Sequence, residues 1–431
     1  MHADFGRAAA AASAAALLVG SMILVLNLAR HTTAVNTAVP STDNSRLTQQ
    51  AQQNGSLAAS TPSGVYVAAG DSIYRLDVRT GKIIWKYNLP GSTQPNFQAT
   101  LSLSSVIPTG NTIYAAANTS SVSAKPSVLA LDAANGKVRW SYQFTNADLV
   151  TLFVSDSVVY AGTNPSTQKV TENSNGSVYA LNAADGMLRT KYHIAGAVSQ
   201  LTAAKNRLYI AASDGLDAIN LTDGKPLWHK GIKSDSPQRS LIITTPHVVD
   251  GLLYTAIVND NEAGPTDSYV AAFDITNGKT VWQSPRAQGQ VFDLVVANNV
   301  VYFGTTIAGV GPFQGTLYAY EARKGNQLWK YAAGGAIQWA PYATDGVVYA
   351  SAYVHMDAPE VVAAVNTADG HEKWKIHVGA GLMTTPYVHN GVVYVASGFG
   401  SNTFVYALKA ADGSQLWKTA LGGDPASMAV V

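Results

Sequence analysis

The stretch IYRLDVRTGKIIW at Ile73–Trp85 decides the fold, because its pattern returns as VLALDAANGKVRW at Val128–Trp140. In both copies an acid is followed four residues later by Gly, and that Gly is followed four residues later by Trp. Eight such units fill the chain from about residue 57 onward. A period of about 40–55 residues indicates one supersecondary unit copied around an axis or along a stack.

Each unit carries four marked positions. A tyrosine on a strand-like run opens it, at Tyr66, Tyr114, Tyr160, Tyr209, Tyr254, Tyr302, Tyr349 and Tyr394. The acid or amide is Asp77, Asp132, Asn182, Asn220, Asp274, Glu321, Asn366 or Lys409. The turn glycines are Gly81, Gly136, Gly186, Gly224, Gly278, Gly325, Gly370 and Gly413. Trp follows at Trp85, Trp140, Trp228, Trp282, Trp329, Trp374 and Trp417, and Thr190 takes this place once. Because Lys409 is accepted at the polar position, we assign that position to turn structure and not to chemistry.

The last unit shows how one repeat folds. Apolar alternation predicts strands over Thr385–Val388, Val392–Ala396, Phe404–Leu408 and Gln415–Lys418. Turns containing Asn-Gly and Asp-Gly separate them, which is the strongest short-range signal for a hairpin. Four short antiparallel strands in each of eight repeats predict an all-β, eight-bladed β-propeller over residues 57–431.

The spacing also predicts how the ring closes. Counting from each Trp places a further first strand at Met428–Val431, while the first unit lacks that strand. Pairing Met428–Val431 into the first blade would hide two sheet edges. The alternative is that Ser56–Ala59 fills the same position.

The repeat resembles the pyrroloquinoline-quinone (PQQ) enzyme-type repeat, through Ile73–Trp85, Val128–Trp140 and their six counterparts. The resemblance implies that each Trp packs between neighbouring blades as a stabilising element. The seam after the third blade, where Thr190 replaces Trp, is therefore expected to be weaker.

The N-terminal residues predict location. No charged residue lies between Arg7 and Arg30, and a helix over residues 8–29 would be about 33 Å long, enough to cross a bilayer. We expect a short cytoplasmic tail at 1–7, a transmembrane signal-anchor helix at 8–29 and a flexible linker at 30–56. The propeller would then lie on the extracytoplasmic side of a bacterial cell membrane. A signal peptide cleaved near Ala34 or Ala38, which would secrete the protein, is the alternative.

Composition excludes several functions. The formal charge of +1 gives no field to attract nucleic acid. Cysteine is absent, so disulfides and Cys-ligated metals are excluded. The histidines show no metal-ligand spacing and are interpreted as surface or turn residues, at positions 193, 229, 247, 355, 371, 377 and 389.

The second-to-third-strand and blade-to-blade connections vary in length among the repeats, whereas the third-to-fourth-strand turn does not. In a four-stranded blade the two variable connections should lie on the same face. Insertions on one face of a repeat protein are typical of a binding face. The alternative is tolerated drift in exposed loops. The candidate binding residues are Phe97, Phe313, Trp339, Tyr353, His355, Met356 and Phe399. Trp339 is expected near the mouth of the central channel or in packing between strands.

The resemblance leaves two functions open. Quinoprotein relatives are PQQ-dependent alcohol or sugar dehydrogenases, with a vicinal disulfide over the quinone and a Ca²⁺ held by oxygen ligands. This Cys-free chain cannot form that disulfide, and its loop acids show no ligand spacing, at Glu172, Asp235, Asp260, Glu262, Asp267, Asp357 and Glu360. The chain is also similar to the non-catalytic, eight-bladed BamB-type propellers, although it lacks their lipidated Cys. We therefore expect a scaffold without catalysis or cofactor that binds a protein partner, or a ligand, on the loop-rich face.

Overall fold

The computed structural model describes residues 61–90, 101–119, 125–145, 147–155, 157–165, 175–235, 239–260, 266–307, 313–355 and 358–431. The expected tail at 1–7, helix at 8–29 and linker at 30–56 lie outside these residues. Within them, no helix has the length and apolar character needed to cross a bilayer.

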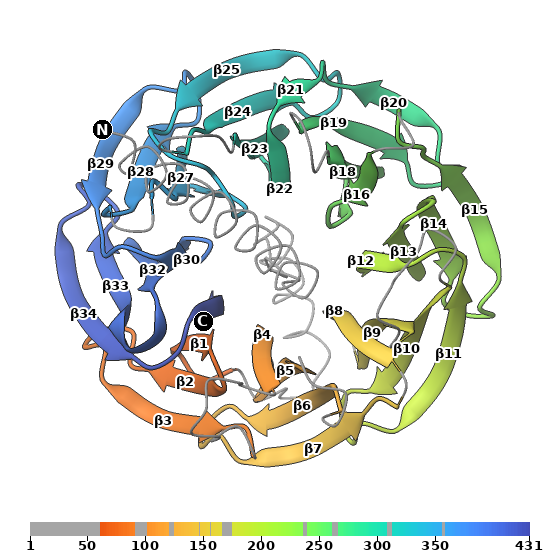
Figure 1. The fold of residues 1–431 in the computed structure, drawn as a ribbon, viewed down its shortest axis with the longest axis horizontal. Coiled ribbons are helices and arrows are strands. Elements are labelled where there is room, and N and C mark those ends of the chain that lie inside the picture. The colour runs from red at the N-terminus through yellow and green to blue at the C-terminus, as the bar shows by residue number, and fades with distance from the viewer. Residues whose placement is uncertain are drawn as a thin grey trace, which may run out of the picture.

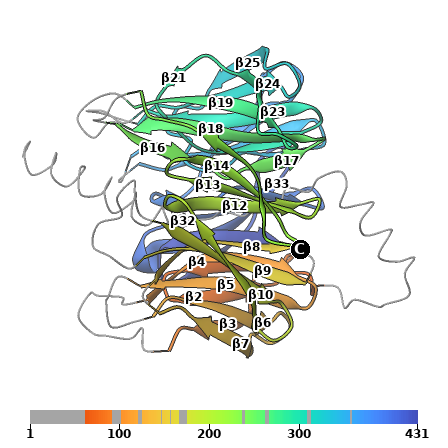
Figure 2. The same ribbon diagram turned by 90° about the vertical axis from the view of Figure 1, so that its right-hand side faces the viewer.

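The described chain forms eight antiparallel sheets arranged around one axis (Figure 1). The predicted eight-bladed propeller of four-stranded blades is thus confirmed. Figure 2 shows the same ring from its side.

The first four blades contain, from the axis outward, these strands. Blade 1 has β35 (Pro425–Val430), β1 (Val65–Ala69), β2 (Ser72–Leu76) and β3 (Ile83–Asn88). Blade 2 has β4 (Leu101–Thr109), β5 (Thr112–Thr119), β6 (Ser127–Asp132) and β7 (Val138–Gln143). Blade 3 has β8 (Ala147–Ser155), β9 (Val158–Pro165), β10 (Gly176–Asn182) and β11 (Leu188–Ile194). Blade 4 has β12 (Val198–Ala204), β13 (Arg207–Ala212), β14 (Gly215–Asn220) and β15 (Pro226–Gly231).

The other four blades follow the same order. Blade 5 has β16 (Ser240–Ile243) and β17 (His247–Val249), then β18 (Leu252–Asp260), β19 (Asp267–Asp274), β20 (Thr280–Gln283) and β21 (Ala287–Gln288). Blade 6 has β22 (Gln290–Ala297), β23 (Val300–Thr306), β24 (Thr316–Glu321) and β25 (Gln327–Ala332). Blade 7 has β26 (Tyr342–Thr344), β27 (Val347–Ala352), β28 (Val361–Asn366) and β29 (Glu372–His377). Blade 8 has β30 (Leu382–Met383) and β31 (Tyr387–His389), then β32 (Val392–Gly398), β33 (Thr403–Lys409) and β34 (Gln415–Leu421), with the 3₁₀ turn η1 (Gly400–Asn402).

Proline interrupts or shortens the innermost strand in three blades. Pro246, Pro341 and Pro386 precede β17, β26 and β31. Because proline has no N–H to donate to the ladder, the inner strands of blades 5 and 8 are split in two.

The ring closes through the C-terminal strand. β35 pairs antiparallel with β1, from Val65 opposite Val430 to Ala69 opposite Pro425. Gly64 and Val431 then exchange backbone hydrogen bonds of 3.0 and 3.1 Å. The predicted closure is confirmed, and the strand begins at Pro425, three residues before the expected start. The alternative segment Ser56–Ala59 lies outside the described residues.

A tryptophan holds each of seven seams between blades. Its indole Nε1–H donates to a backbone carbonyl of the next blade at 2.6–3.1 Å. The acceptor is always the residue after the acid or amide: Ala133, Ala183, Ile275, Ala322, Thr367, Ala410 and Val78. The indole also lies against the turn glycine of that blade, where a Cβ would approach it to 2.5–2.8 Å. These glycines have φ between +68° and +75°, so both the turn and the contact require glycine.

The seam between blades 3 and 4 is built differently. Thr190 is exposed, and Tyr192, two residues later on β11, lies against Gly224 instead, at 3.2 Å from the position of an added Cβ. Tyr192 is buried, so it supplies apolar contact. The seam has no counterpart of the indole hydrogen bond among the described residues.

The loops separate into two faces. Third-to-fourth-strand turns bond to first-to-second-strand turns, as in Ala133 N–H to Asn111 O and Ala410 N–H to Gly391 O. On the other face, the blade-to-blade connection at Asp424 accepts from Gly70 N–H, which lies in a second-to-third-strand turn. The two kinds of variable connection therefore share one face, as the loop lengths predict. We call it the loop-rich face.

Replacing Trp282 by Phe should destabilise the protein by about 1–2 kcal/mol, because the Ala322 carbonyl loses its indole donor while most apolar contact remains. The midpoint of urea unfolding measures this. Thr190→Val, at the exposed counterpart position, is the control and should move the midpoint little. Equal effects of the two substitutions would contradict the assigned role of the indole.

The blade 3–blade 4 seam should also open more often than the others, because no indole hydrogen bond crosses it. Hydrogen exchange of the outermost strands checks this, with β11 exchanging faster than β25. Equal protection of β11 and β25 would show that Tyr192 compensates fully.

Candidate functional site

Apart from Trp339, the predicted binding residues that the structure describes lie in three second-to-third-strand connections of the loop-rich face, in blades 6, 7 and 8. Phe313 follows β23, His355 follows β27 and Phe399 follows β32. His355 is exposed, whereas Phe313 and Phe399 are half-buried. Phe97 and Met356 fall outside the described residues.

Two of these residues join blades 6 and 7. The Phe313 and Tyr353 rings meet edge to face with centroids 5.2 Å apart, and Phe313 N–H donates to Val354 O at 3.1 Å. Tyr353 is only 3% exposed, so it supports Phe313 instead of presenting a surface of its own. Trp339 precedes β26, is half-buried and packs against the core between blades 7 and 8.

The loop that carries His355 is anchored by a buried carboxylate. Glu360 is fully buried, and its two carboxylate oxygens accept from Val354 N–H at 2.6 Å and Gly381 N–H at 3.2 Å. Burial raises the pKa of Glu360 to about 7, against the opposing effect of the two hydrogen bonds. Glu360 thus ties the blade 7 loop to the crossover entering blade 8. Its place in the sequence gave no sign of this burial.

Blade 5 carries a network of charges on the same face. Asp267 is bound by Arg239 and by Arg286, and Asp235 lies 3.2 Å from Arg286. Burial raises the pKa of Asp267, but hydrogen bonds from both guanidinium groups outweigh it and hold the pKa below its usual range. Since each positive charge meets a carboxylate, the network fixes loop positions and leaves little net field.

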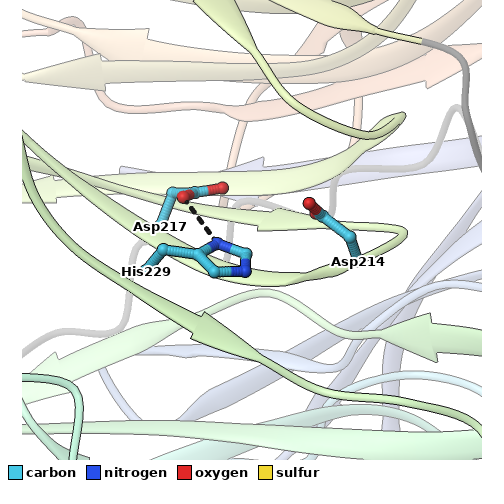
Figure 3. A group of neighbouring side chains, drawn as sticks. All are labelled: Asp214, Asp217 and His229. Atoms are coloured by element: carbon cyan, nitrogen blue, oxygen red, sulfur yellow. Dashed lines mark hydrogen bonds and ion pairs between the residues drawn. The ribbon is translucent and has the colours of Figure 1, made fainter.

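Blade 4 holds the one group of three His, Asp or Glu side chains within metal-ligand reach among the described residues: Asp214, Asp217 and His229 (Figure 3). Asp217 on β14 faces His229 on β15, with Oδ1 and Nδ1 2.9 Å apart, and Asp214 lies in the turn before β14. Burial raises the pKa of Asp217, the His229 hydrogen bond opposes this, and Asp214 adds to the rise. His229 is exposed, as its interpretation as a surface residue predicts, but pairing of β14 with β15 also places it opposite Asp217, twelve residues earlier in the sequence.

A polar layer surrounds the axis. In each innermost strand, one residue pairs with the repeat tyrosine of the neighbouring strand. Two residues before that partner, seven of the eight blades have a polar side chain: Ser105, Thr151, Gln200, Thr245, Asp293, Thr385 and Ser427. Some of these groups bond across seams, as in Thr151 to Gln200 at 3.0 Å and His247 Nε2 to Asp293 at 2.9 Å. The layer is buried apart from the half-buried Gln200, and it links blades near the axis.

Comparison with known proteins identifies the family. The family model described as outer membrane protein assembly factor BamB matches residues 31–265 and 266–430. The chain belongs to the BamB family. BamB from Yersinia pestis is 27% identical over 257 residues, which cover 56% of this chain and 58% of that protein. The structure of BamB from Moraxella catarrhalis is 20% identical, covers 79% of this chain and 92% of its own, and has a TM-score of 0.54.

Two relatives with other names match parts of the chain. Tetrathionate hydrolase from Acidithiobacillus ferrooxidans is 23% identical over 335 residues, covering 70% of this chain and 64% of that protein. Quinohemoprotein alcohol dehydrogenase ADH-IIG from Pseudomonas putida is 34% identical over 119 residues, covering 25% of this chain and 16% of that protein. The chain thus spans less than two thirds of the length of the curated relatives it matches.

Glu360 should make stability depend on pH. Its folded pKa of about 7 lies above the ordinary value of 4.5, so the folded state holds the proton more tightly and loses stability as pH rises from about 4.5 through 7. The Glu360→Gln variant does not lose stability in this way. It has one hydrogen-bond acceptor fewer than wild type, and the stability lost through this does not vary with pH. The difference in free energy of unfolding between wild type and variant should therefore shift in favour of the variant between pH 5 and pH 8. A shift in favour of the wild type would contradict the assigned burial.

Proposed function

We propose that this protein is a non-catalytic scaffold that binds a protein partner through the loop-rich face. The observation that carries the proposal is the division between the two faces: one is built from turns of fixed length, and the other from connections of variable length. Membership of the BamB family supports the choice of a protein partner, because that family is described by its part in outer-membrane protein assembly.

The exposed part of the proposed surface centres on the loops of blades 6, 7 and 8. Phe313 is held by Tyr353, and His355 follows a segment fixed by Glu360. Half-buried aromatic residues on a supported backbone are typical of interaction hot spots, because little conformational entropy is lost on binding. The Glu360 anchor is thus a positioning element for the surface.

We further propose that residues 8–29 anchor the chain as a single-pass helix in a bacterial cell membrane, with residues 30–56 as linker and the propeller on the extracytoplasmic side. The 22-residue uncharged run at 8–29 supports this placement. Secretion after cleavage near Ala34 or Ala38 is the competing arrangement. The size of the mature protein in membrane and soluble fractions distinguishes the two.

Site-specific photocrosslinking tests the partner. A photoreactive residue at His355 should capture a protein in the cell envelope. The same residue at Lys324, an exposed position in a third-to-fourth-strand turn on the opposite face, is the matched control and should capture none. Equal capture at Lys324 and His355, or no capture at either, would contradict a partner on the loop-rich face.

A PQQ-dependent alcohol or sugar dehydrogenase is the second candidate, favoured by the local similarity to the alcohol dehydrogenase from Pseudomonas putida. Two observations argue against its cofactor. Without Cys the chain cannot form the vicinal disulfide. Among the described residues, the acids and histidine within metal-ligand distance of one another lie on β14, β15 and the turn before β14, away from the innermost strands. Titration with PQQ and Ca²⁺ checks this, and saturable binding with dye-coupled alcohol oxidation would overturn the scaffold proposal.

A further inference from the structure

Blade 4 carries an acid opposite a histidine at a cross-strand position whose residues vary among the blades. Three residues before the acid or amide, the third strand of four other blades carries a tyrosine opposite a lysine of the fourth strand. These pairs are Tyr74–Lys86, Tyr179–Lys191, Tyr318–Lys330 and Tyr406–Lys418. In blade 4 the same position holds Asp217 opposite His229. A large aromatic group is thus replaced by a short carboxylate that is mostly buried, with 19% of its side chain exposed.

In two blades the tyrosine reaches the connection from the preceding blade. The Tyr74 hydroxyl accepts from Gly422 N–H at 3.1 Å, and the Tyr406 hydroxyl accepts from Gly379 N–H at 2.9 Å. The matching connection before blade 4 contains Gly196, and Asp214 lies there instead, 2.7 Å from the position of an added Gly196 Cβ. Two carboxylates therefore occupy the space that one phenol ring fills elsewhere.

The carboxylates lack the partners that their burial requires. Asp214 Oδ1 and Asp217 Oδ2 are enclosed and accept no hydrogen bond from any described residue. An enclosed carboxylate oxygen without a donor is costly, and a second carboxylate nearby adds repulsion. No lysine or arginine forms an ion pair with either group in the described structure. A bound cation would remove both costs.

The donor set selects the class of cation. A ligand atom from each of Asp214, Asp217 and His229 lies within 4.8 Å of the other two, and the closest pair is 2.9 Å apart. Tetrahedral zinc with bonds of about 2.0–2.1 Å requires ligand atoms about 3.3 Å apart, so the side chains would have to shift by up to about 1.5 Å on binding. One imidazole with two carboxylates suits zinc better than calcium or magnesium, which take oxygen ligands.

We infer that Asp214, Asp217 and His229 form a divalent-cation site of the zinc class on blade 4. Three protein ligands leave a position for water on the solvent side, where the His229 side chain is 47% exposed. On binding through Nδ1, the imidazole would be neutral with its one proton on Nε2, and any further ring proton would be released to solvent. The site lies beside the seam that lacks Trp, because Asp217 is on the same face of β14 as Ile219, which packs against blade 3. The ion would fix the β14–β15 pair and the preceding turn at that seam.

Calorimetric titration of the purified, untagged full-length protein with zinc chloride tests the inference. Wild type should bind one zinc ion per chain with saturation and show a higher melting temperature when saturated. His229→Gln should weaken binding at least tenfold and abolish the melting shift. The exposed position of His229 makes this variant the one least prone to misfolding, which circular dichroism verifies. Asp214→Asn should act like it.

His371→Gln is the matched control, because His371 is an exposed histidine of a blade 7 turn, outside the group. It should leave zinc affinity unchanged. X-ray absorption of the zinc-loaded protein should show one imidazole among nitrogen and oxygen ligands. Absence of saturable binding, or equal affinity in wild type and His229→Gln, would overturn the inference.

Discussion

The contact between an indole and the turn glycine of the next blade is the interaction on which the ring depends. Blades of a repeat protein touch only their neighbours, so each seam must fix its own geometry. The indole buries apolar area, which sets the distance between neighbouring blades. Its N–H donates to one carbonyl of the adjacent turn, which fixes the position of one blade relative to the next along the axis. The contact also requires a glycine, because any Cβ would collide with the ring. The Trp and the Gly are therefore two halves of one interface, although they lie in different repeats.

This pairing explains why the fold could be predicted so far from the sequence. Period, turn chemistry and the Trp position are local features, and they determine blade number, strand order and closure. The interruptions of the inner strands were not predicted: Thr385–Val388 was expected as one strand, but β31 begins only at Tyr387, after Pro386. The start of β35 at Pro425 was missed for a related reason: proline at a strand end is compatible with pairing, since its missing N–H lies at the end of the ladder.

The candidate site was less accessible to such reasoning. Loop lengths indicated the face, but they could not show that Tyr353 is buried while His355 is exposed. The group on blade 4 depends on register, because Asp217 and His229 meet only when β14 and β15 are aligned. Aligning the repeats by their glycines would have placed Asp217 and His229 at paired positions, where four other blades have tyrosine and lysine. Burial of Glu360 had no such signal, because it follows from a contact between the blade 7 loop and the crossover entering blade 8.

Closure by β35 has a consequence for the order of events during biogenesis. The first blade receives its innermost strand from β35, which is made after the strands of the other seven blades, so blade 1 stays three-stranded, with an open edge on β1, until β35 pairs. No earlier blade can supply this missing strand, because each of them already uses its own strands in its own sheet. A nascent chain of this protein therefore remains an open ring until β35 has been made, and during that time the exposed edge of β1 can pair with a neighbouring chain.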